Sequence, residues 1–351
     1  MYYKTDPFVA SWVSRSYAHT NNWEILEMVR ILNQKGYWVD ILDRNVNIVD
    51  LDLKDQYDLC VCVGDGNPLK NFAELAKKTK KAKHILYTTG IESQLSRKLV
   101  AERYVYFHKR HPNENVQIRR MPVNVNLSEI AGDIDAFFCI GNEYTMQGYE
   151  KHQKPMYRIH PSSSPVIETK MNFENKDPAK FLYFGGNGNL EKGLDLVVEA
   201  ILGLSDVELY ICAPEKEAEF NGVYRMLMEK ASNIHSLGFI QPGGKRFHEV
   251  TEMCGFIVFP ASSEGTATSV TTCMRRGMVP VVTRESGIDI GDFGITVPDV
   301  HLEALREQMK ELSGMSKEEL VERAKKTQEH SEQYTEHGFS RSFKEALESV
   351  L

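Results

Sequence analysis

The stretch GFIVFPASSEGTATSVTTCMRRGMVPVVT, residues 255–283, gives the clearest indication of the fold. It opens with GFIVFP and closes with MVPVVT, two short apolar runs whose β-branched and aromatic residues are typical of buried strands. Between them the sequence predicts a helix that begins near Ala267 and ends at Gly277, because glycine is preferred just beyond a helix C-terminus. A strand, a helix and a second strand in this order predict a parallel βαβ unit.

Apolar runs alternate with helical patterns along the rest of the chain, which predicts parallel sheets covered by helices. After residue 300 the pattern is helical to the end. We therefore expect an α/β protein with two doubly wound, Rossmann-like sheets. The predicted strands are 8–14, 37–43, 58–64, 83–89, 135–141 and 155–160 in the first half, and 181–186, 207–213, 233–239, 255–261 and 278–283 in the second.

The length of 351 residues exceeds that of one ordinary core and suggests about two domains. Residues 160–180, HPSSSPVIETKMNFENKDPAK, show little periodicity and contain the Ser, Pro and Asn residues expected at a domain boundary. We place a first domain at residues 1–162 and a second at residues 163–333. The final helical segment, residues 334–351, is considered with the resemblance described below.

The composition, with 42% hydrophobic and 26% charged residues, is that of a soluble globular protein. No segment approaches the roughly 18 consecutive apolar residues of a membrane helix. The first ten residues also lack a secretory signal, so we expect a cytoplasmic protein. The net charge of −7 divides into about +3 for residues 1–160 and about −10 for residues 161–351. A negative total without a basic and aromatic module argues against nucleic-acid binding.

The six cysteines are scattered, mostly inside apolar runs, and no pair has CxxC or zinc-ligand spacing. We interpret them as reduced core residues. Cys60 and Cys62 would share one face of a strand, so a redox pair is the alternative to simple burial. The acidic runs at 50–52 and 133–135 are interpreted as strand-edge or helix-entry acids, and no metal site is predicted.

A glycine-rich loop follows the predicted strand at 181–186. The segment FLYFGGNGNLEKGLDLVVEA, residues 181–200, leads from this strand into a helix whose opening turn would contain Lys192. Glycines let the backbone approach an anion closely, and the N–H groups at a helix start carry about half a positive charge. The loop therefore suggests a diphosphate site, although its spacing fits neither the dinucleotide nor the Walker motif. A structural tight turn is the alternative.

A second polar loop follows the strand at 255–261. Glu264 stands at its edge, and Gly265 to Ser269 offer amides and hydroxyl groups at the predicted start of the helix. As a helix-terminal acid, Glu264 would gain some 0.3–1 kcal/mol from the helix dipole. Capping alone does not need so long a run of small residues. We therefore favour a ligand whose hydroxyl is held by the carboxylate and whose phosphate is held by the amides.

The segments YFGGNGNLEKGLDLVVEA, NIHSLGF, VFPASSEGTATSV and RRGMVPVVTRESGI together resemble the nucleotide-binding half of glycosyltransferase family 4, the retaining enzymes of GT-B fold. The similarity covers roughly residues 178–300. It implies two Rossmann-like domains facing a central cleft, with residues 1–162 binding the acceptor and residues 163–333 binding a nucleotide sugar. It also implies that a C-terminal helix in residues 334–351 crosses back to the first domain.

The resemblance implies a role for each matching residue. Lys192 would neutralise the donor diphosphate and Glu264 would hold a sugar hydroxyl, which makes them the two predicted catalytic residues. The position of the family's second glutamate is Thr272, and Gly186 stands near the place of a commonly present arginine. Arg275 and Arg276 are candidates to compensate for that arginine, but we favour their interpretation as solvated charges at a helix end. The predicted donor-binding residues are Gly185, Gly186, Asn187, Gly188, Gly265, Thr266, Ala267, Thr268, Ser269, Thr272 and Glu285.

Acceptor-side residues are expected at the carboxyl ends of strands in the first domain, where doubly wound sheets bind ligands. Each candidate also has a plain interpretation as a cap or turn residue. The candidates are His19, Thr20, Asn21, Thr89, Gly90, Asn142 and Glu143.

The expected activity is transfer of a sugar, with retention and without a metal ion, from a UDP- or GDP-linked donor to a glycan or lipid-linked acceptor. No cofactor is expected besides the substrate. A nucleotide-sugar epimerase and a non-catalytic sugar-nucleotide binder are the alternatives. Basic runs at 76–84 and 97–120 suggest contact with anionic lipid at the inner face of the plasma membrane, with a solvated helix face as the other interpretation.

Overall fold

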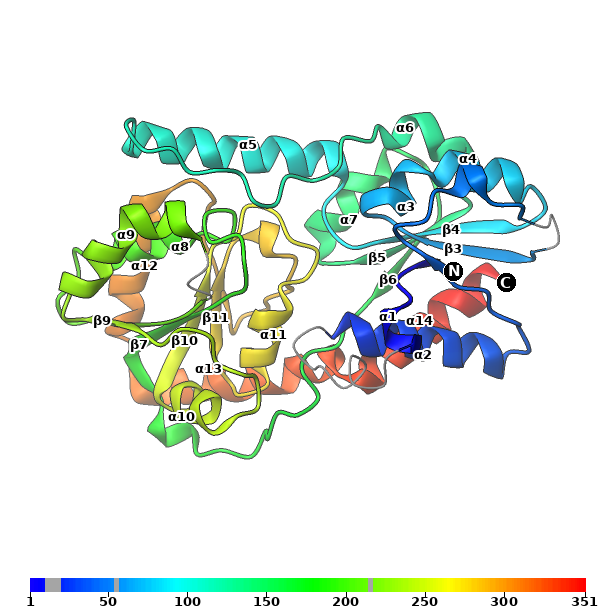
Figure 1. Ribbon diagram of the computed structural model, residues 1–351. Helices are drawn as coiled ribbons and strands as arrows, with labels where there is room; N and C mark the ends of the chain where they lie inside the picture. Colours follow the sequence, from blue (N-terminus) through cyan, green and yellow to red (C-terminus); the bar gives the residue numbers. More distant parts are fainter. Residues whose placement is uncertain (10–19, 54–56, 214–216) are drawn as a thin grey trace. The chain divides into compact units, whose positions relative to one another are not determined.

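The computed structural model describes residues 1–9, 20–53, 57–213 and 217–351 (Figure 1). The chain divides into two compact units. Unit 1 comprises residues 1–97, 122–162 and 333–351, and unit 2 comprises residues 98–121 and 163–332. Each unit contains one six-stranded parallel sheet, as the alternating pattern predicts. Among the described residues, no helix is both long enough and apolar enough to cross a membrane.

The sheet of unit 1 has the strand order β2-β1-β3-β4-β5-β6, and its neighbouring strands are parallel. Successive side chains of each strand alternate between its two faces. Cys60 and Cys62 therefore lie in one buried cluster, while Val61 and Val63 lie in the other. The strands are β1 (Tyr2–Tyr3), β2 (Leu42–Asp43), β3 (Leu59–Val63), β4 (Lys83–Thr88), β5 (Ala136–Ile140) and β6 (Met156–Ile159).

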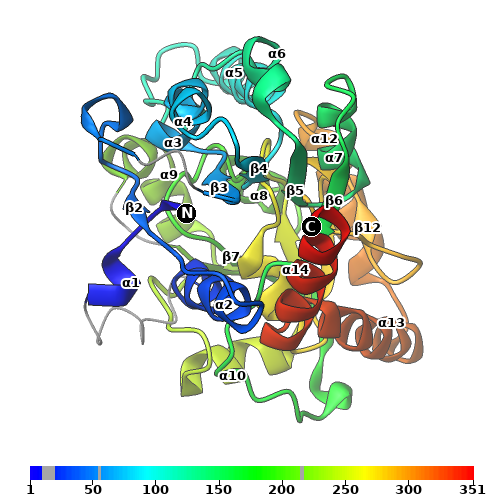
Figure 2. The same ribbon diagram turned by 90° about the vertical axis from the view of Figure 1, so that its right-hand side faces the viewer.

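Helices cover both faces of this sheet (Figures 1 and 2). One face packs against α3 (Gly66–Lys70), α4 (Phe72–Lys78), α6 (Leu127–Ile130) and α7 (Glu143–Glu150), and the other packs against α2 (Asn21–Gln34) and α14 (Glu336–Val350). All six cysteines of the chain are buried and free, which agrees with their interpretation as reduced core residues.

The C-terminal helix α14 belongs to unit 1. Phe339 and Phe343 are fully buried beside α2, and the ring of Phe339 meets that of Trp23 edge to face at 5.8 Å between centroids. Burying each of these phenylalanine side chains contributes about 1.5–3 kcal/mol. The chain therefore returns to its first unit after completing the second, which confirms the expectation for the C-terminal helix.

The sheet of unit 2 has the order β12-β11-β10-β7-β8-β9, again with parallel neighbours. The strands are β7 (Asp177–Phe184), β8 (Glu208–Cys212), β9 (Ile234–Ser236), β10 (Cys254–Phe259), β11 (Val279–Val282) and β12 (Ile295–Thr296). Two groups of helices flank it: α8 (Leu194–Ile201), α9 (Ala218–Lys230) and α12 (Leu302–Ser313) form one, and α10 (Lys245–Met253), α11 (Thr268–Met274) and α13 (Lys317–His330) form the other.

Two predicted strands differ from the structure. At the predicted strand 8–14, residues Asp6–Val9 form helix α1, and residues 10–14 lie outside the described residues. Pro7 suits the first turn of a helix because its fixed φ matches helical geometry. At the predicted strand 37–43, only Leu42 and Asp43 pair, because β1 offers partners only at Tyr2 and Tyr3. The strands β1 and β12 were not predicted from the sequence.

Residues 98–121, placed in the first domain by the sequence analysis, pack within unit 2. They include most of helix α5 (Ser93–Arg110). Arg103 is fully buried, pairs with Asp299, and lies 3.8 Å from the buried carboxylate of Asp195. Arg110 pairs with the same Asp195 at 2.5 Å and with Glu199 at 3.0 Å. Buried charges need such partners, so these arginines hold residues 98–110 of α5 within unit 2.

We expect Arg103→Ala to lower the free energy of unfolding by about 3–5 kcal/mol, because it breaks the buried ion pair with Asp299 and removes one of the two cations beside Asp195. Chemical denaturation followed by circular dichroism would measure the change. Lys98→Ala is the matched control, since the Lys98 side chain is mostly exposed on the same helix. Equal stabilities of the two variants would contradict the importance assigned to the buried charge.

Candidate functional site

The two loops predicted to bind a donor lie together in unit 2, at the carboxyl ends of neighbouring strands β7 and β10. Ser262 donates from its N–H and its hydroxyl to the carbonyl oxygen of Glu191, at 2.8 and 3.0 Å. Gly193 has a φ of +79°, and a Cβ there would overlap the carbonyl oxygen of Pro260. Glycine at this position therefore permits the close approach of the two loops.

Lys192 and Glu264, the two predicted catalytic residues, interact electrostatically. Lys192 lies in the turn before α8, which begins at Leu194, so it precedes the helix that was expected to contain it. Burial lowers the pKa of Lys192, and the Glu264 carboxylate offsets part of that effect. Burial acts to raise the pKa of Glu264, but Arg120 and Lys192 hold it below its usual range. Glu264 is therefore a carboxylate at neutral pH, suited to accept a hydrogen bond from a hydroxyl.

The glycine loop holds a carboxylate of its own chain. The N–H groups of Gly188 and Asn189 donate to Glu217, at 2.5 Å and 3.0 Å. The N–H of Gly185 instead extends the sheet by donating to Cys212. The amides at 188 and 189 thus hold an internal carboxylate, and the diphosphate role predicted for this loop stays a prediction. Gly186 lies near Lys192, whose Nζ would be 3.5 Å from a Cβ at that glycine.

The second loop is hydrogen-bonded to the backbone of residues 285–287. Glu264 and Ala267 donate their N–H groups to the carbonyls of Glu285 and Ser286, at 2.9 and 3.0 Å, and Thr266 donates its hydroxyl to Gly287. Helix α11 follows from Thr268, so Thr268 and Ser269 form its first turn, and Gly277 lies beyond its end with a φ of +61°. The predicted helix and its glycine terminator are both present.

Several predicted donor residues have partners within unit 2. The Thr272 hydroxyl accepts from the N–H of Ser164 at 3.3 Å, and the Glu285 carboxylate accepts from Arg284 at 2.9 Å. Arg276 is buried and donates to the carbonyls of Glu168 and Lys170, so it binds the interdomain segment. The donor-binding roles of Gly185, Gly186, Asn187, Gly188, Gly265, Thr266, Ala267, Thr268, Ser269, Thr272 and Glu285 stay predictions.

Arg120 is a residue of this site that the sequence analysis missed. Its guanidinium donates to Glu264 Oε1, and a Cβ at Gly188 would lie 2.6 Å from its Cδ. The two paired residues are 144 positions apart in the sequence. The Arg-Arg pair at 119–120 was visible only as part of a basic run, so no local signal distinguished Arg120.

The described acceptor-side candidates lie at the carboxyl ends of strands in unit 1, and His19 falls outside the described residues. Thr20 precedes α2, and Asn21 accepts from Lys4 at 2.7 Å. Thr89 and Gly90 follow β4, and the Gly90 carbonyl accepts from Tyr149. Asn142 and Glu143 follow β5: Asn142 caps α7 through the N–H of Thr145 at 3.0 Å, and Glu143 is the first residue of that helix. Capping therefore accounts for Asn142, while the acceptor role of these residues stays a prediction.

A buried polar cluster lies beside these candidates. Lys4 donates to Asn21 and Asn22 at the start of α2, and Glu24 accepts from the N–H and hydroxyl of Ser162 at 2.7 and 3.0 Å. Burial raises the pKa of Glu24 to about 7 and lowers that of Lys4 to about 8. Both groups thus change charge near neutral pH.

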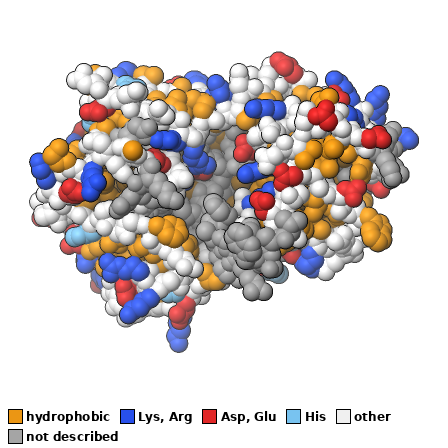
Figure 3. Space-filling model, in the orientation of Figure 1, with side chains coloured by type: hydrophobic (Ala, Val, Ile, Leu, Met, Phe, Trp, Pro, Cys, Tyr) orange, Lys and Arg blue, Asp and Glu red, His pale blue; other side chains and the backbone are white. Residues whose placement is uncertain are grey.

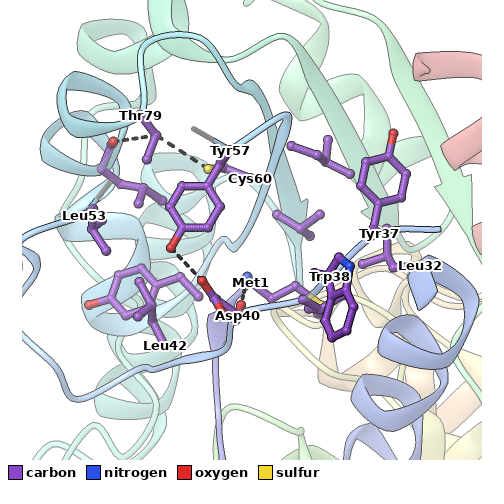
Figure 4. Close-up of a pocket in the computed structure, with 15 residues that line it drawn as sticks. Met1, Leu32, Tyr37, Trp38, Asp40, Leu42, Leu53, Tyr57, Cys60 and Thr79 are labelled. Atoms are coloured by element: carbon purple, nitrogen blue, oxygen red, sulfur yellow. Dashed lines mark hydrogen bonds between the residues drawn. The ribbon is translucent and has the colours of Figure 1, made fainter. Parts of the chain in front are cut away.

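The cavity in Figure 4 lies elsewhere in unit 1. It is lined by apolar and aromatic side chains, among them Trp38 and Leu42, and the Asp40 carboxylate inside it accepts from the Tyr57 hydroxyl at 2.8 Å. Among its lining residues, Met1 precedes β1, Asp40 precedes β2, and Leu59 is the first residue of β3. The cavity is therefore at the amino ends of these strands, away from the acceptor-side candidates.

The basic runs of the sequence have different environments. In the second run, Arg103 and Arg110 are engaged in the ion pairs of unit 2 described above and do not form a solvated basic face. In the first run, Lys77, Lys80 and Lys81 are exposed on unit 1. Figure 3 shows basic and acidic side chains interspersed on the face of unit 1 in view. Among the described residues, no group of three or more His, Cys, Asp or Glu side chains is placed to hold a metal ion.

No protein-family model and no curated protein matches the sequence. Solved structures do match the fold. WaaG, a glycosyltransferase involved in lipopolysaccharide biosynthesis, has a TM-score of 0.56 and 12% identity over 93% of this chain and 95% of its own. Anabaena HepE, solved in complex with UDP and glucose, has a TM-score of 0.58 and 12% identity over 92% of this chain and 89% of its own.

A longer neighbour is the pneumococcal O-GlcNAc transferase GtfA in complex with UDP and GlcNAc. It has a TM-score of 0.55 and 13% identity over 86% of this chain and 58% of its own. The chain spans little more than half the length of GtfA and of TarM, of which it covers 54%. At these identities the likeness establishes the fold, and together with the two parallel sheets it shows that the chain has the GT-B fold.

Gly193→Ala is expected to separate the two loops, because the added methyl would overlap Pro260 and alanine disfavours the left-handed backbone. We expect a loss of about 1–3 kcal/mol of stability from the strain alone. Thermal unfolding would measure this loss. Gly222→Ala in α9 is the control, since a Cβ there meets no atom within 4 Å. Equal destabilisation of both variants would contradict the close packing inferred at Gly193.

The raised pKa of Glu24 makes the stability of unit 1 depend on pH. An unfolded glutamate titrates near 4.5, whereas folded Glu24 titrates near 7. The folded state therefore retains the proton between these values, and the contribution of Glu24 to stability falls as pH rises through this window. Glu24→Gln removes this dependence. Between pH 4.5 and 8, the free energy of unfolding of wild type should therefore fall by about 3 kcal/mol relative to that of Glu24→Gln.

Urea unfolding at several pH values would measure this difference. The glutamine can still accept the hydrogen bonds of Ser162, and Glu102→Gln, at a half-exposed side chain, is the control. A stability difference between wild type and Glu24→Gln that does not vary with pH would contradict the assignment.

Proposed function

We propose that this protein is a retaining glycosyltransferase that moves a sugar from a UDP- or GDP-linked donor to a hydroxyl of a glycan or lipid-linked acceptor. The observation that carries the proposal is the position of Lys192 and Glu264 on adjoining loops at the carboxyl edge of a parallel sheet. A cation and helix-start amides suit a diphosphate, and a carboxylate suits a sugar hydroxyl. The neighbouring structures in complex with UDP and GlcNAc or with UDP and glucose support this donor class.

The reaction places its largest charge on the departing diphosphate. The bond from the sugar C1 to the phosphate oxygen breaks with its electron pair on oxygen, and the acceptor oxygen forms the new bond to C1 on the same face. The acceptor proton passes to the departing phosphate oxygen. Lys192 and amides of the second loop, between Gly265 and Thr268, stabilise the developing charge, a contribution that is often the largest in catalysis. Glu264 orients the sugar by accepting from one of its hydroxyls.

Metal independence, cellular location and acceptor class belong to the same proposal. The resemblance supports transfer without a metal ion, so chelation with EDTA is expected to leave the rate unchanged. We propose that the protein acts in polysaccharide or glycolipid assembly in the cytoplasm. With a lipid-linked acceptor it would work at the inner face of the plasma membrane.

A panel of radiolabelled nucleotide sugars tests the activity. Release or transfer of the labelled sugar supports a glycosyltransferase, and NMR of the product anomer distinguishes retention from inversion. Interconversion of the donor sugar would indicate a nucleotide-sugar epimerase. Binding without turnover would indicate a sugar-nucleotide-binding protein.

Glu264→Gln and Lys192→Ala are each expected to reduce turnover at least about tenfold, because a loss of about 1.4 kcal/mol in the transition state suffices. Initial rates with the best donor of the panel would measure this. Glu229→Gln is the control, since this glutamate is exposed on α9 and pairs only with Arg225 among the ion pairs of the described residues. Near-normal rates in both site variants would remove the assignment.

A further inference from the structure

The backbone that carries Arg120 is fixed to the glycine loop. The buried carboxylate of Glu191 accepts through Oε1 from the N–H groups of Arg119 and Arg120, at 2.7 and 2.8 Å. The Tyr104 hydroxyl lies 3.0 Å from the same Oε1. Glu191 directly precedes Lys192, so the segment ending at Arg120 is attached to the residue beside the predicted diphosphate cation.

The side chain of Arg120 connects the two loops. Its Cδ lies against Gly188 of the first loop, and its guanidinium reaches Glu264 of the second. The Arg120 side chain is 44% exposed, whereas that of Glu264 is 13% exposed. The guanidinium is therefore accessible to a ligand from solvent while it holds the carboxylate.

Two cations lie at this pair. Arg120 and Lys192 both interact with the Glu264 carboxylate, and Glu217 and Glu191 also act on Lys192. The repulsion between the cations lowers the pKa of Lys192 further. A diphosphate offers a planar guanidinium two oxygens at once, the geometry of the strongest arginine contacts, and the exposed part of Arg120 can reach such a group from solvent.

We propose that Arg120 and Glu264 form an exchange pair for the activated sugar. When the donor binds, the Arg120 guanidinium transfers from Glu264 to the diphosphate, and the released carboxylate accepts from a sugar hydroxyl. Arg120 and Glu264 thus stay paired until the diphosphate binds to Arg120 and the sugar hydroxyl binds to Glu264. This assignment rests on the proposed function and adds a binding residue from the segment 98–121. A partly exposed ion pair contributes little to stability, so the exchange has a low cost.

Titration calorimetry with UDP and GDP, which lack the sugar, tests the exchange. Arg120→Gln is expected to weaken binding of the diphosphate by about tenfold or more, since it removes a charge-assisted contact. Arg119→Gln is the matched control, because it removes the same charge one residue away. It also keeps the backbone N–H that donates to Glu191. Arg120→Lys retains the charge without the planar fork and should give an intermediate affinity. Thermal melting of each variant checks that it is folded.

Glu264→Gln is expected to change the affinity for UDP or GDP in the direction opposite to Arg120→Gln. It removes the competitor for Arg120, so UDP or GDP should bind about threefold tighter or more, although turnover falls. In the double variant Arg120→Gln/Glu264→Gln most of this tightening should disappear, because the guanidinium is no longer present to be released. A simple loss of repulsion between Glu264 and the diphosphate would tighten binding equally in both backgrounds.

The outcomes separate the two proposals. If wild type binds UDP or GDP and Arg120→Gln binds it with the same affinity, the exchange is overturned and the proposed function still stands. Equal weakening by Arg119→Gln and Arg120→Gln also overturns it, because general electrostatic attraction would then explain both. If wild type binds neither nucleoside diphosphate and turns over no nucleotide sugar, the proposed function fails and the exchange fails with it.

Discussion

The buried guanidinium of Arg103 donates to the carbonyl oxygens of Leu190 and Pro260, at 3.1 and 2.6 Å. One of these carbonyls belongs to the glycine loop and the other follows β10. A planar group with five donors in a fixed arrangement can satisfy both while it pairs with Asp299. Without it, two buried carbonyls would lose their donor and the approach of the loops at Gly193 would lack support. The geometry of the candidate site thus depends on a residue that does not face it.

The parts of the fold that follow from local patterns were predictable. Buried parallel strands appear as continuous apolar runs, and nine of the predicted runs, from 58–64 and 83–89 through 278–283, contain strands. The errors occur where pairing depends on a partner elsewhere. At 37–43 the sequence favours a strand, yet β1 can pair only with Leu42 and Asp43. Trp38 lies in the unpaired part and is 99% exposed. Its high β propensity therefore did not lead to a strand, because no neighbouring strand pairs with this segment.

The candidate site shows the same division. The two loops were visible because glycines, a lysine and a glutamate follow apolar runs, and their adjacency follows from the order of strands in a doubly wound sheet. Arg103 and Arg120 were not visible, because their partners are up to 196 and 144 residues away. In the sequence both belonged to a basic run that suggested a surface. Burial among carbonyls and carboxylates arises from tertiary packing, which residue type alone does not reveal.

The division of the chain into units also bears on how the protein can be dissected. Unit 2 is assembled from two separate stretches, and the shorter one, residues 98–121, is reached before the boundary at 162. A fragment starting at residue 163 would therefore contain the interior carboxylate of Asp195 without Arg103 or Arg110, its two charged partners. Cutting at the boundary would not release an independent second unit. A separable version would need the 98–121 stretch supplied as a second peptide or grafted by circular permutation.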